Sequence, residues 1–281
     1  METNMLQLFF VVTYFLSWIW FAAAAYILRY TGLIPSGAGS FLFLPGVIMP
    51  ALVAIGLTAR SEGRAGIARL LRGILRWRVH VGWYVFAMGF MIAIKLVSAV
   101  IYRIAVGGWP SFTPVTWYFI AAAVLFSTPI QAGEEIGWRA FALPRLANRF
   151  GLPNASIILG LIWAAWHLPF FYLPGSDNIG QSFPIFLIAV TAISVAMAWL
   201  YSRTNQSLLL VMLMHAAIDN SAGIATSPIL ATVPNPFALP QAAWPWITAL
   251  LLCATAFWFF TQMKKERETK QQLRLLLPVF L

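Results

Sequence analysis

The chain has 281 residues, of which 61% are hydrophobic and only 9% are charged. A soluble domain of this length usually carries about 25% charged residues, so the composition excludes an ordinary soluble globular protein. The formal net charge of +10 does not indicate a nucleic-acid-binding protein, because the Lys and Arg residues lie between and after long apolar segments. The single cysteine, Cys253, excludes a disulfide within the chain and a cysteine-based zinc site.

Long apolar segments follow one another along the whole chain. About 20 helical residues cross a hydrocarbon layer about 30 Å thick, and the 13 tryptophans fit the aromatic belts of membrane interfaces. We expect spans at residues 5–28, 40–59, 83–106, 116–130, 155–173, 183–201, 208–222 and 244–261. The sequence therefore predicts an all-α, polytopic integral membrane protein with about eight transmembrane helices, in a single domain over residues 1–281.

Residues 60–79, between the second and third predicted spans, are rich in arginine. Apolar side chains recur there at helical spacing, and arginines surround them. The apolar positions are Leu70, Leu71, Ile74 and Leu75, and the basic positions are Arg64, Arg69, Arg72, Arg76 and Arg78. The pattern indicates a basic amphipathic helix that lies on an anionic membrane leaflet. An ordinary loop is the alternative.

The distribution of basic residues predicts the orientation in the membrane. Eight spans place both termini on one side. On that side lie 15 of the 18 Lys and Arg residues, while Arg29 and Arg103 lie on the other side and Lys95 lies within the third span. Because basic residues are retained in the cytoplasm, we expect both termini to be cytoplasmic. The compact chain, without a recognisable eukaryotic targeting feature, favours a bacterial plasma membrane. The oligomeric state is not predicted.

Two adjacent glutamates and an arginine interrupt the apolar pattern at residues 134–139. Ionisable side chains at membrane depth are costly and mark functional sites. In a helix, Glu135 and Arg139 lie four residues apart on one face and form an ion pair. Glu134 points about 100° away without a local partner, which makes it the candidate general base. The alternative is that both glutamates only pair with arginines at a helix end.

Two of the three histidines also fall in predicted spans. Trp163 lies four residues before His167, so its ring can pack beside the imidazole. His215 and Asp219 share the same spacing, and such a pair can fix one tautomer of the ring or bind one ligand. Lys95 can pair with an acid of this site or extend into a water-filled cavity. Each of these polar groups alone could serve only as a helix-packing contact, but together they predict one buried active site.

The three motifs resemble those of a known family. They are, in order, Glu134-Glu135-x-x-x-Arg139, Trp163-x-x-x-His167 and His215-x-x-x-Asp219. Their order, spacing and membrane placement are similar to the CAAX protease and bacteriocin-processing family of intramembrane glutamic endopeptidases. The resemblance implies a conical helical bundle with an intramembrane active site, and a catalytic core over about residues 116–222.

The resemblance also implies a role for each polar residue. Glu134 would activate a water molecule, and His167 would help to orient it. His215 and Asp219 would stabilise the oxyanion that forms at the scissile carbonyl. The supporting residues would be Glu135, Arg139, Asn220 and Trp163.

Two positions depart from the family pattern. Trp163 stands where Phe is commoner, and Asp219 stands where the well-studied CAAX enzymes have Asn. An ionised carboxylate cannot donate a hydrogen bond to an oxyanion. Asp219 must therefore be protonated, orient His215 instead, or leave Asn220 to act.

We therefore predict an intramembrane endopeptidase without a cofactor. Its substrate would be a membrane-associated peptide or protein, either of the prenylated CAAX type or like a bacteriocin or pheromone. A metal-dependent protease is an alternative with Glu134, His167 and His215 as zinc ligands, although their spacing lacks the HExxH signature. A non-catalytic immunity or scaffold protein and a proton-coupled carrier are further alternatives, although no inverted repeat supports the carrier.

Overall fold

The structure, a computed structural model, describes residues 2–32, 39–112, 116–221 and 233–276. The regular elements in these ranges are all helices, which confirms the predicted all-α class. The α-helices are α1 (Glu2–Tyr30), α2 (Leu44–Leu71), α3 (Val81–Val106), α4 (Trp117–Ser127), α5 (Ala132–Glu135), α6 (Leu143–Phe150), α7 (Leu152–Trp166), α8 (Phe183–Arg203), α9 (Leu208–Asn220) and α10 (Ala243–Leu276). The shorter elements are 3₁₀ helices at Gly39–Phe43, Arg72–Leu75 and Leu168–Phe171 and a π-helix at Ile136–Ala142.

Five helical segments of the described chain are long and apolar enough to cross a membrane. They are Asn4–Tyr30, Phe41–Leu75, Val81–Val106, Phe183–Arg203 and Ala243–Thr269. Three shorter apolar helices, α4, α7 and α9, coincide with the remaining predicted spans. Their 11, 15 and 13 residues give lengths of only about 17–23 Å, less than a hydrocarbon layer of about 30 Å. Each of these helices is therefore too short to cross such a layer by itself.

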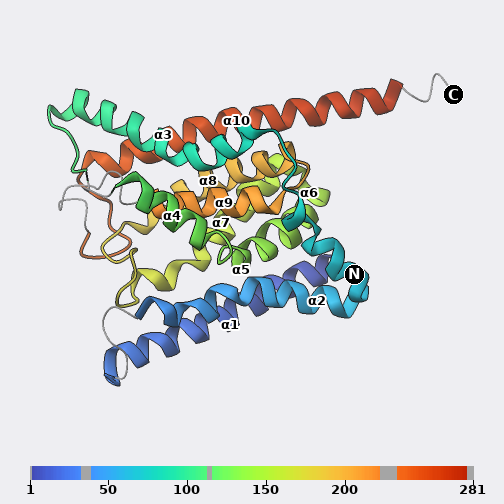
Figure 1. Cartoon of the computed structure of the whole chain (residues 1–281), viewed down its shortest axis with the longest axis horizontal. Helices are drawn as coiled ribbons and strands as arrows, with labels where there is room; N and C mark the ends of the chain where they lie inside the picture. Colours follow the sequence, from blue (N-terminus) through green and yellow to red (C-terminus); the bar gives the residue numbers. More distant parts are fainter. Residues whose placement is uncertain (1, 33–38, 113–115, 222–232, 277–281) are drawn as a thin grey trace.

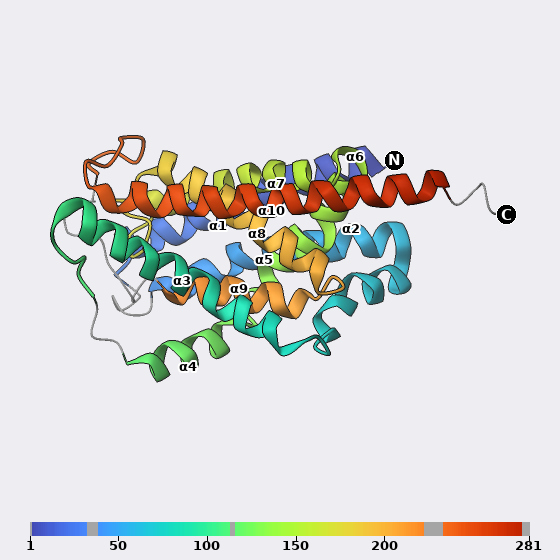
Figure 2. The same ribbon diagram turned by 90° about the horizontal axis from the view of Figure 1, so that it is seen from above.

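The helices lie roughly side by side along one axis (Figure 1). The pair α1 and α2 forms one side, α3 and α10 form the other, and α7, α8 and α9 lie between them. α4 lies at the edge of the bundle, next to α9 (Figure 2). The start of α1 and the end of α10 lie at the same end of the bundle in both views, which agrees with an even number of passes.

The predicted amphipathic helix is present but shorter than residues 60–79. The chain turns at Gly63, whose φ of 64° lies in the left-handed region that favours glycine. The helical piece over residues 64–71 then buries Leu70 and exposes Arg64 and Arg69. Leu70 is therefore buried as the pattern predicts, whereas Leu75 is 77% exposed, and contact of the arginines with an anionic leaflet stays a prediction.

The core of the bundle is centred on α8, whose residues 192–201 are all buried. α7 approaches α8 closely at Gly160, where a Cβ atom would lie 2.7 Å from the Cα atom of Thr191. Small residues at such contacts let helix backbones pack tightly in a membrane. The close packing of α7 on α8 therefore fixes the position of the polar residues at the end of α7.

Candidate active site

The segment that carries the two glutamates packs closely on α2. Gly133 and Gly137, four residues apart, face this helix. A Cβ atom at Gly137 would lie 2.6 Å from the Pro50 side chain, and one at Gly133 would lie 3.1 Å from the Cα atom of Ile48. Small residues at this spacing are a known helix-packing device in membranes. The sequence prediction missed this contact, although the Gly-x-x-x-Gly spacing is its signal.

Glu134 is buried, with 5% of its surface exposed. Its Oε2 atom accepts hydrogen bonds from two indoles, Trp163 Nε1 at 2.6 Å and Trp138 Nε1 at 3.3 Å. Its Oε1 atom makes no hydrogen bond to the described residues. The expectation that Glu134 lacks a local partner is wrong, because Trp138 lies four residues further along the same helical face. One carboxylate oxygen is thus held and the other is left for a ligand.

Glu135 and Arg139 form the expected ion pair, and neither side chain is exposed. Arg139 Nη1 lies 2.8 Å from Glu135 Oε1. The same oxygen lies 2.8 Å from His215 Nδ1. Arg139 Nη2 also lies 3.2 Å from the sulfur of Met197. Glu135 is therefore enclosed by protein groups, in contrast to its neighbour.

His167 lies at the C-cap of α7 and not inside a span. The helix predicted over residues 155–173 ends early because Pro169 follows and disfavours an α conformation just before it. The Nδ1 atom lies 2.8 Å from the carbonyl oxygen of Trp163. Since a carbonyl only accepts, Nδ1 carries the proton, and Nε2 of the neutral ring is an acceptor. Nε2 has no partner among the described residues, so it can accept a hydrogen bond from a ligand.

His215 and Asp219 differ sharply in exposure. The His215 side chain is buried, whereas 51% of the Asp219 side chain is exposed. His215 Nε2 lies 3.7 Å from Asp219 Oδ2, which is too long for a hydrogen bond. Gln131 Nε2, which the sequence prediction missed, donates to that oxygen at 2.8 Å. His215 is therefore oriented mainly by Glu135, and Asp219 marks the accessible side of the site.

Asn220 and Lys95 lie beside the site and not in it. The Asn220 side-chain amide donates at 2.8 Å to Ser127 Oγ and at 2.8 Å to the Ala216 carbonyl, so it links α9 to α4. Lys95 Nζ donates at 2.7 Å to the carbonyl of Ser221. A cation there compensates the negative C-terminal end of α9. The partners expected for Lys95, the carboxylates of Asp219 and Glu134, are not the group that it contacts.

Trp163 connects the three motifs. Its Nε1 donates to Glu134, and its carbonyl accepts from His167. Its ring meets the His215 ring edge to face, with the ring centroids 5.1 Å apart. The Arg139 guanidinium lies 4.0 Å from the centroid of the same ring. A Phe would keep the ring contacts and lose the N–H group, so the departure from the family pattern adds one donor to the site.

Within the part of the chain that the structure describes, no three His, Cys, Asp or Glu side chains are placed together to hold a metal ion. The alternative ligand set of Glu134, His167 and His215 is packed around Trp163, which contacts each of the three. The expectation that the protein needs no cofactor stays a prediction.

Residues 113–221, which include the whole cluster around Trp163, match the model of the family described as Rce1-like type II CAAX prenyl endopeptidase. This part of the chain, which carries all three motifs, is similar to that family. A curated relative, CAAX prenyl protease 2 from Methanococcus maripaludis, is 25% identical over 230 residues, which make up 75% of this chain and 79% of the relative. The predicted family and the prediction of a membrane endopeptidase are thereby confirmed.

Proposed function

We propose that this Rce1-like protein hydrolyses a peptide bond with a water molecule that Glu134 activates. The contrast between the two adjacent glutamates is the observation that supports this most. Glu134 is held at one oxygen by indole groups and has no protein partner at the other. Glu135 is fully buried between Arg139 and His215. Glu135 Oε2 also lacks a partner, but Glu135 is fully buried, whereas Glu134 is 5% exposed, so Glu134 is the better placed of the two to bind water.

In the proposed reaction, Glu134 takes a proton from the water molecule, and the water oxygen bonds to the scissile carbonyl carbon. His167 Nε2 accepts a hydrogen bond from the second O–H group of that water, which stays on the oxygen and directs its lone pair. When the C–N bond breaks, Glu134 gives its proton to the leaving nitrogen. The products are a carboxylic acid and an amine, and Glu134 is again a carboxylate.

The oxyanion of the intermediate needs a hydrogen-bond donor. His215 would supply Nε2–H in its doubly protonated form, because Glu135 accepts from Nδ1 and Nε2 faces the side of the exposed Asp219. A protonated Asp219 would be a second donor. Asn220 fits this role less well, since its amide already donates to two other groups.

The name of the curated relative supports a substrate class. We propose that the substrate of this chain is also a membrane-associated, prenylated C-terminal peptide. We also propose that the whole chain forms a single membrane domain. We also propose that the end of the bundle with both termini is cytoplasmic. The arginines there would contact the anionic leaflet, and they are Arg64, Arg69, Arg72, Arg76 and Arg78.

Cleavage assays with the full-length protein in proteoliposomes test the mechanism. The substrates are a peptide mixture that includes prenylated C-terminal peptides, and mass spectrometry identifies the products. Glu134→Gln should lower kcat/KM by at least about a hundredfold, because a general base contributes about 10²–10⁴. Glu268→Gln, on the exposed surface of α10, is the matched control and should cleave at the wild-type rate.

Three results would count against this mechanism. Normal cleavage by Glu134→Gln would remove Glu134 as the base, and loss of wild-type cleavage with a chelator would favour the metal-dependent alternative. A wild-type protein that cleaves none of the peptides would favour the non-catalytic immunity or scaffold alternative.

A further inference from the structure

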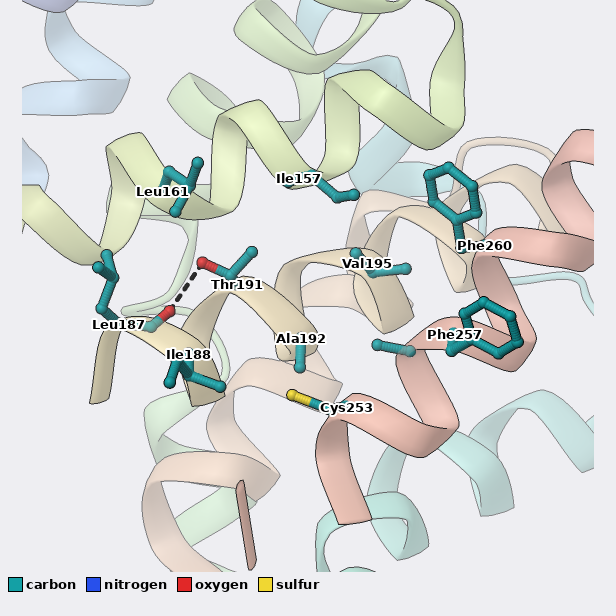
Figure 3. A pocket seen from close by; sticks show the side chains of 11 residues that line it. Ile157, Leu161, Leu187, Ile188, Thr191, Ala192, Val195, Cys253, Phe257 and Phe260 are labelled. Carbon is teal, nitrogen blue, oxygen red and sulfur yellow. Dashed lines mark hydrogen bonds between the residues drawn. The ribbon is translucent and has the colours of Figure 1, made fainter. Parts of the chain in front are cut away.

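An apolar groove of about 440 Å³ runs along the outside of the bundle between α7, α8 and α10 (Figure 3). Its lining includes Leu161 of α7, Ile188 of α8, and Cys253, Phe257 and Phe260 of α10. Leu161, Ile188 and Phe257 are 45%, 42% and 72% exposed. The groove is therefore open to the hydrocarbon around the bundle.

The groove offers no free hydroxyl to a polar ligand. The Thr191 hydroxyl donates to the Leu187 carbonyl at 2.7 Å, as the dashed line in Figure 3 marks. The groove also lies on the far face of α7 from the catalytic cluster, because Leu161 and Trp163 are two residues apart and point in roughly opposite directions. The groove therefore suits an apolar chain, and it is separate from the active site.

Two cations continue the groove-lining face of α10. Lys264 lies four residues after Phe260, and Arg267 lies seven residues after it, so all three share one face of the helix. Both cationic side chains are exposed. Arg267 Nη1 approaches the carbonyl of Phe150 at 3.5 Å, and its guanidinium packs against Gly151. An apolar groove with this cationic end fits a molecule that joins an apolar chain to an anionic head.

The spacing along α10 agrees with the depth of one leaflet. Lys264 lies 11 residues after Cys253, which corresponds to about 16 Å of helix. Half of a hydrocarbon layer of about 30 Å is about 15 Å. A chain that starts at the cations and ends near Cys253 therefore has the length of one acyl chain.

We propose that this groove binds an anionic phospholipid of the bilayer, with one acyl chain along Cys253, Phe257 and Phe260 and the phosphate at Lys264 and Arg267. The site binds lipid from the leaflet on the side of the chain termini. It does not depend on the proposed proteolytic mechanism, because none of these residues contacts the catalytic cluster.

Native mass spectrometry of the full-length protein in detergent tests the head-group contact. Phosphatidylglycerol should bind about thirtyfold more tightly than phosphatidylcholine with the same chains, since each nearby cation contributes about fivefold. Lys264→Gln should remove about fivefold of this preference, and Lys264→Gln/Arg267→Gln should remove all of it. Lys265→Gln removes an exposed cation about 100° away on the same helix and should leave the preference unchanged. Equal binding of both lipids, or equal losses with Lys264→Gln and Lys265→Gln, overturns the proposal.

Photo-crosslinking in nanodiscs tests the position of the acyl chain. Phosphatidylglycerol with a diazirine near the end of one acyl chain should label peptides of α8 and α10 that contain Ile188 and Cys253. Cys253→Trp fills the groove and should lower this labelling at least about tenfold, whereas Val100→Trp on the exposed face of α3 should not. Labelling of the wild type that is spread evenly over the exposed apolar helices overturns the proposal, whatever the folding of either variant.

Discussion

The buried ion pair of Glu135 and Arg139 gives the most direct test of how the site is held together. We predict that Arg139→Met lowers the free energy of unfolding by about 3–5 kcal/mol, because it leaves an uncompensated charge in a desolvated place. Neither side chain is exposed. Glu135 Oε2 and Arg139 Nε also lack any hydrogen-bond partner among the described residues. After the change the Glu135 carboxylate keeps its contact with His215 Nδ1 at 2.8 Å but loses the guanidinium.

The double variant Glu135→Gln/Arg139→Met separates the cost of a lone charge from the worth of the pair. A Gln at position 135 can still accept a hydrogen bond from His215 Nδ1, which now lies 2.8 Å from the carboxylate. Replacing a whole buried pair is often neutral or stabilising. We therefore expect the double variant to be more stable than Arg139→Met by at least about 2 kcal/mol.

Equilibrium unfolding in mixed micelles, with a titrated anionic detergent and far-UV circular dichroism, measures these free energies. Arg149→Met is the control, because Arg149 is exposed and should change the free energy of unfolding by less than about 0.5 kcal/mol. The reasoning is refuted if Arg139→Met unfolds at the wild-type midpoint. It is also refuted if the free-energy changes of Glu135→Gln and Arg139→Met add up to that of the double variant, since the pair would then not be desolvated.

Three further predictions concern packing and polar contacts around the site. Gly137→Ala puts a methyl group 2.6 Å from an atom of α2 and should lower the free energy of unfolding by about 1–3 kcal/mol. Gly56→Ala is the control, because its methyl group meets nothing within 4 Å and should leave the free energy of unfolding unchanged. The same micelle titration compares the two variants. Trp163→Phe should lose about 1.5–3 kcal/mol with the hydrogen bond to Glu134 yet still cleave peptide, and complete inactivity in the cleavage assay would contradict this. Lys95→Met should destabilise the fold by about 1 kcal/mol with cleavage retained, and inactivity at normal stability would place the lysine in the site.

The helices could be predicted from the sequence, but their lengths could not. A backbone that crosses hydrocarbon must satisfy its hydrogen bonds internally, so long apolar runs identify helices reliably. The predicted span over residues 116–130 stops at Ser127, and that over residues 155–173 stops at Trp166. Prolines follow both ends, and short apolar helices look like spanning ones in composition. Hydropathy reports the apolar surroundings of a helix and not whether lipid or protein provides them.

Within the site, contacts along one helix could be predicted and contacts between helices could not. The pair of Glu135 and Arg139 follows from a spacing of four residues. The contacts of His215 with Glu135 and of Trp163 with Glu134 depend on how α7 and α9 are rotated against the glutamate segment. Residue spacing holds no information on that rotation. Trp138 could have been found by the same spacing rule, but tryptophans were expected at membrane interfaces.

The placement of Glu135 and Arg139 on one helical turn also bears on the biosynthesis of the protein. An unpaired charge at the centre of an inserting helix costs about 2.5–3.5 kcal/mol, and His215, which also binds Glu135, is synthesised 80 residues later. We expect residues 117–150 to insert into microsomes better than the same segment with Arg139→Ala/Ala140→Arg, which keeps the composition and moves the cation out of the four-residue spacing from both glutamates; equal insertion would contradict this. Because the two charges neutralise each other locally, the glutamate segment can enter the bilayer before the helices that complete its active site have left the ribosome.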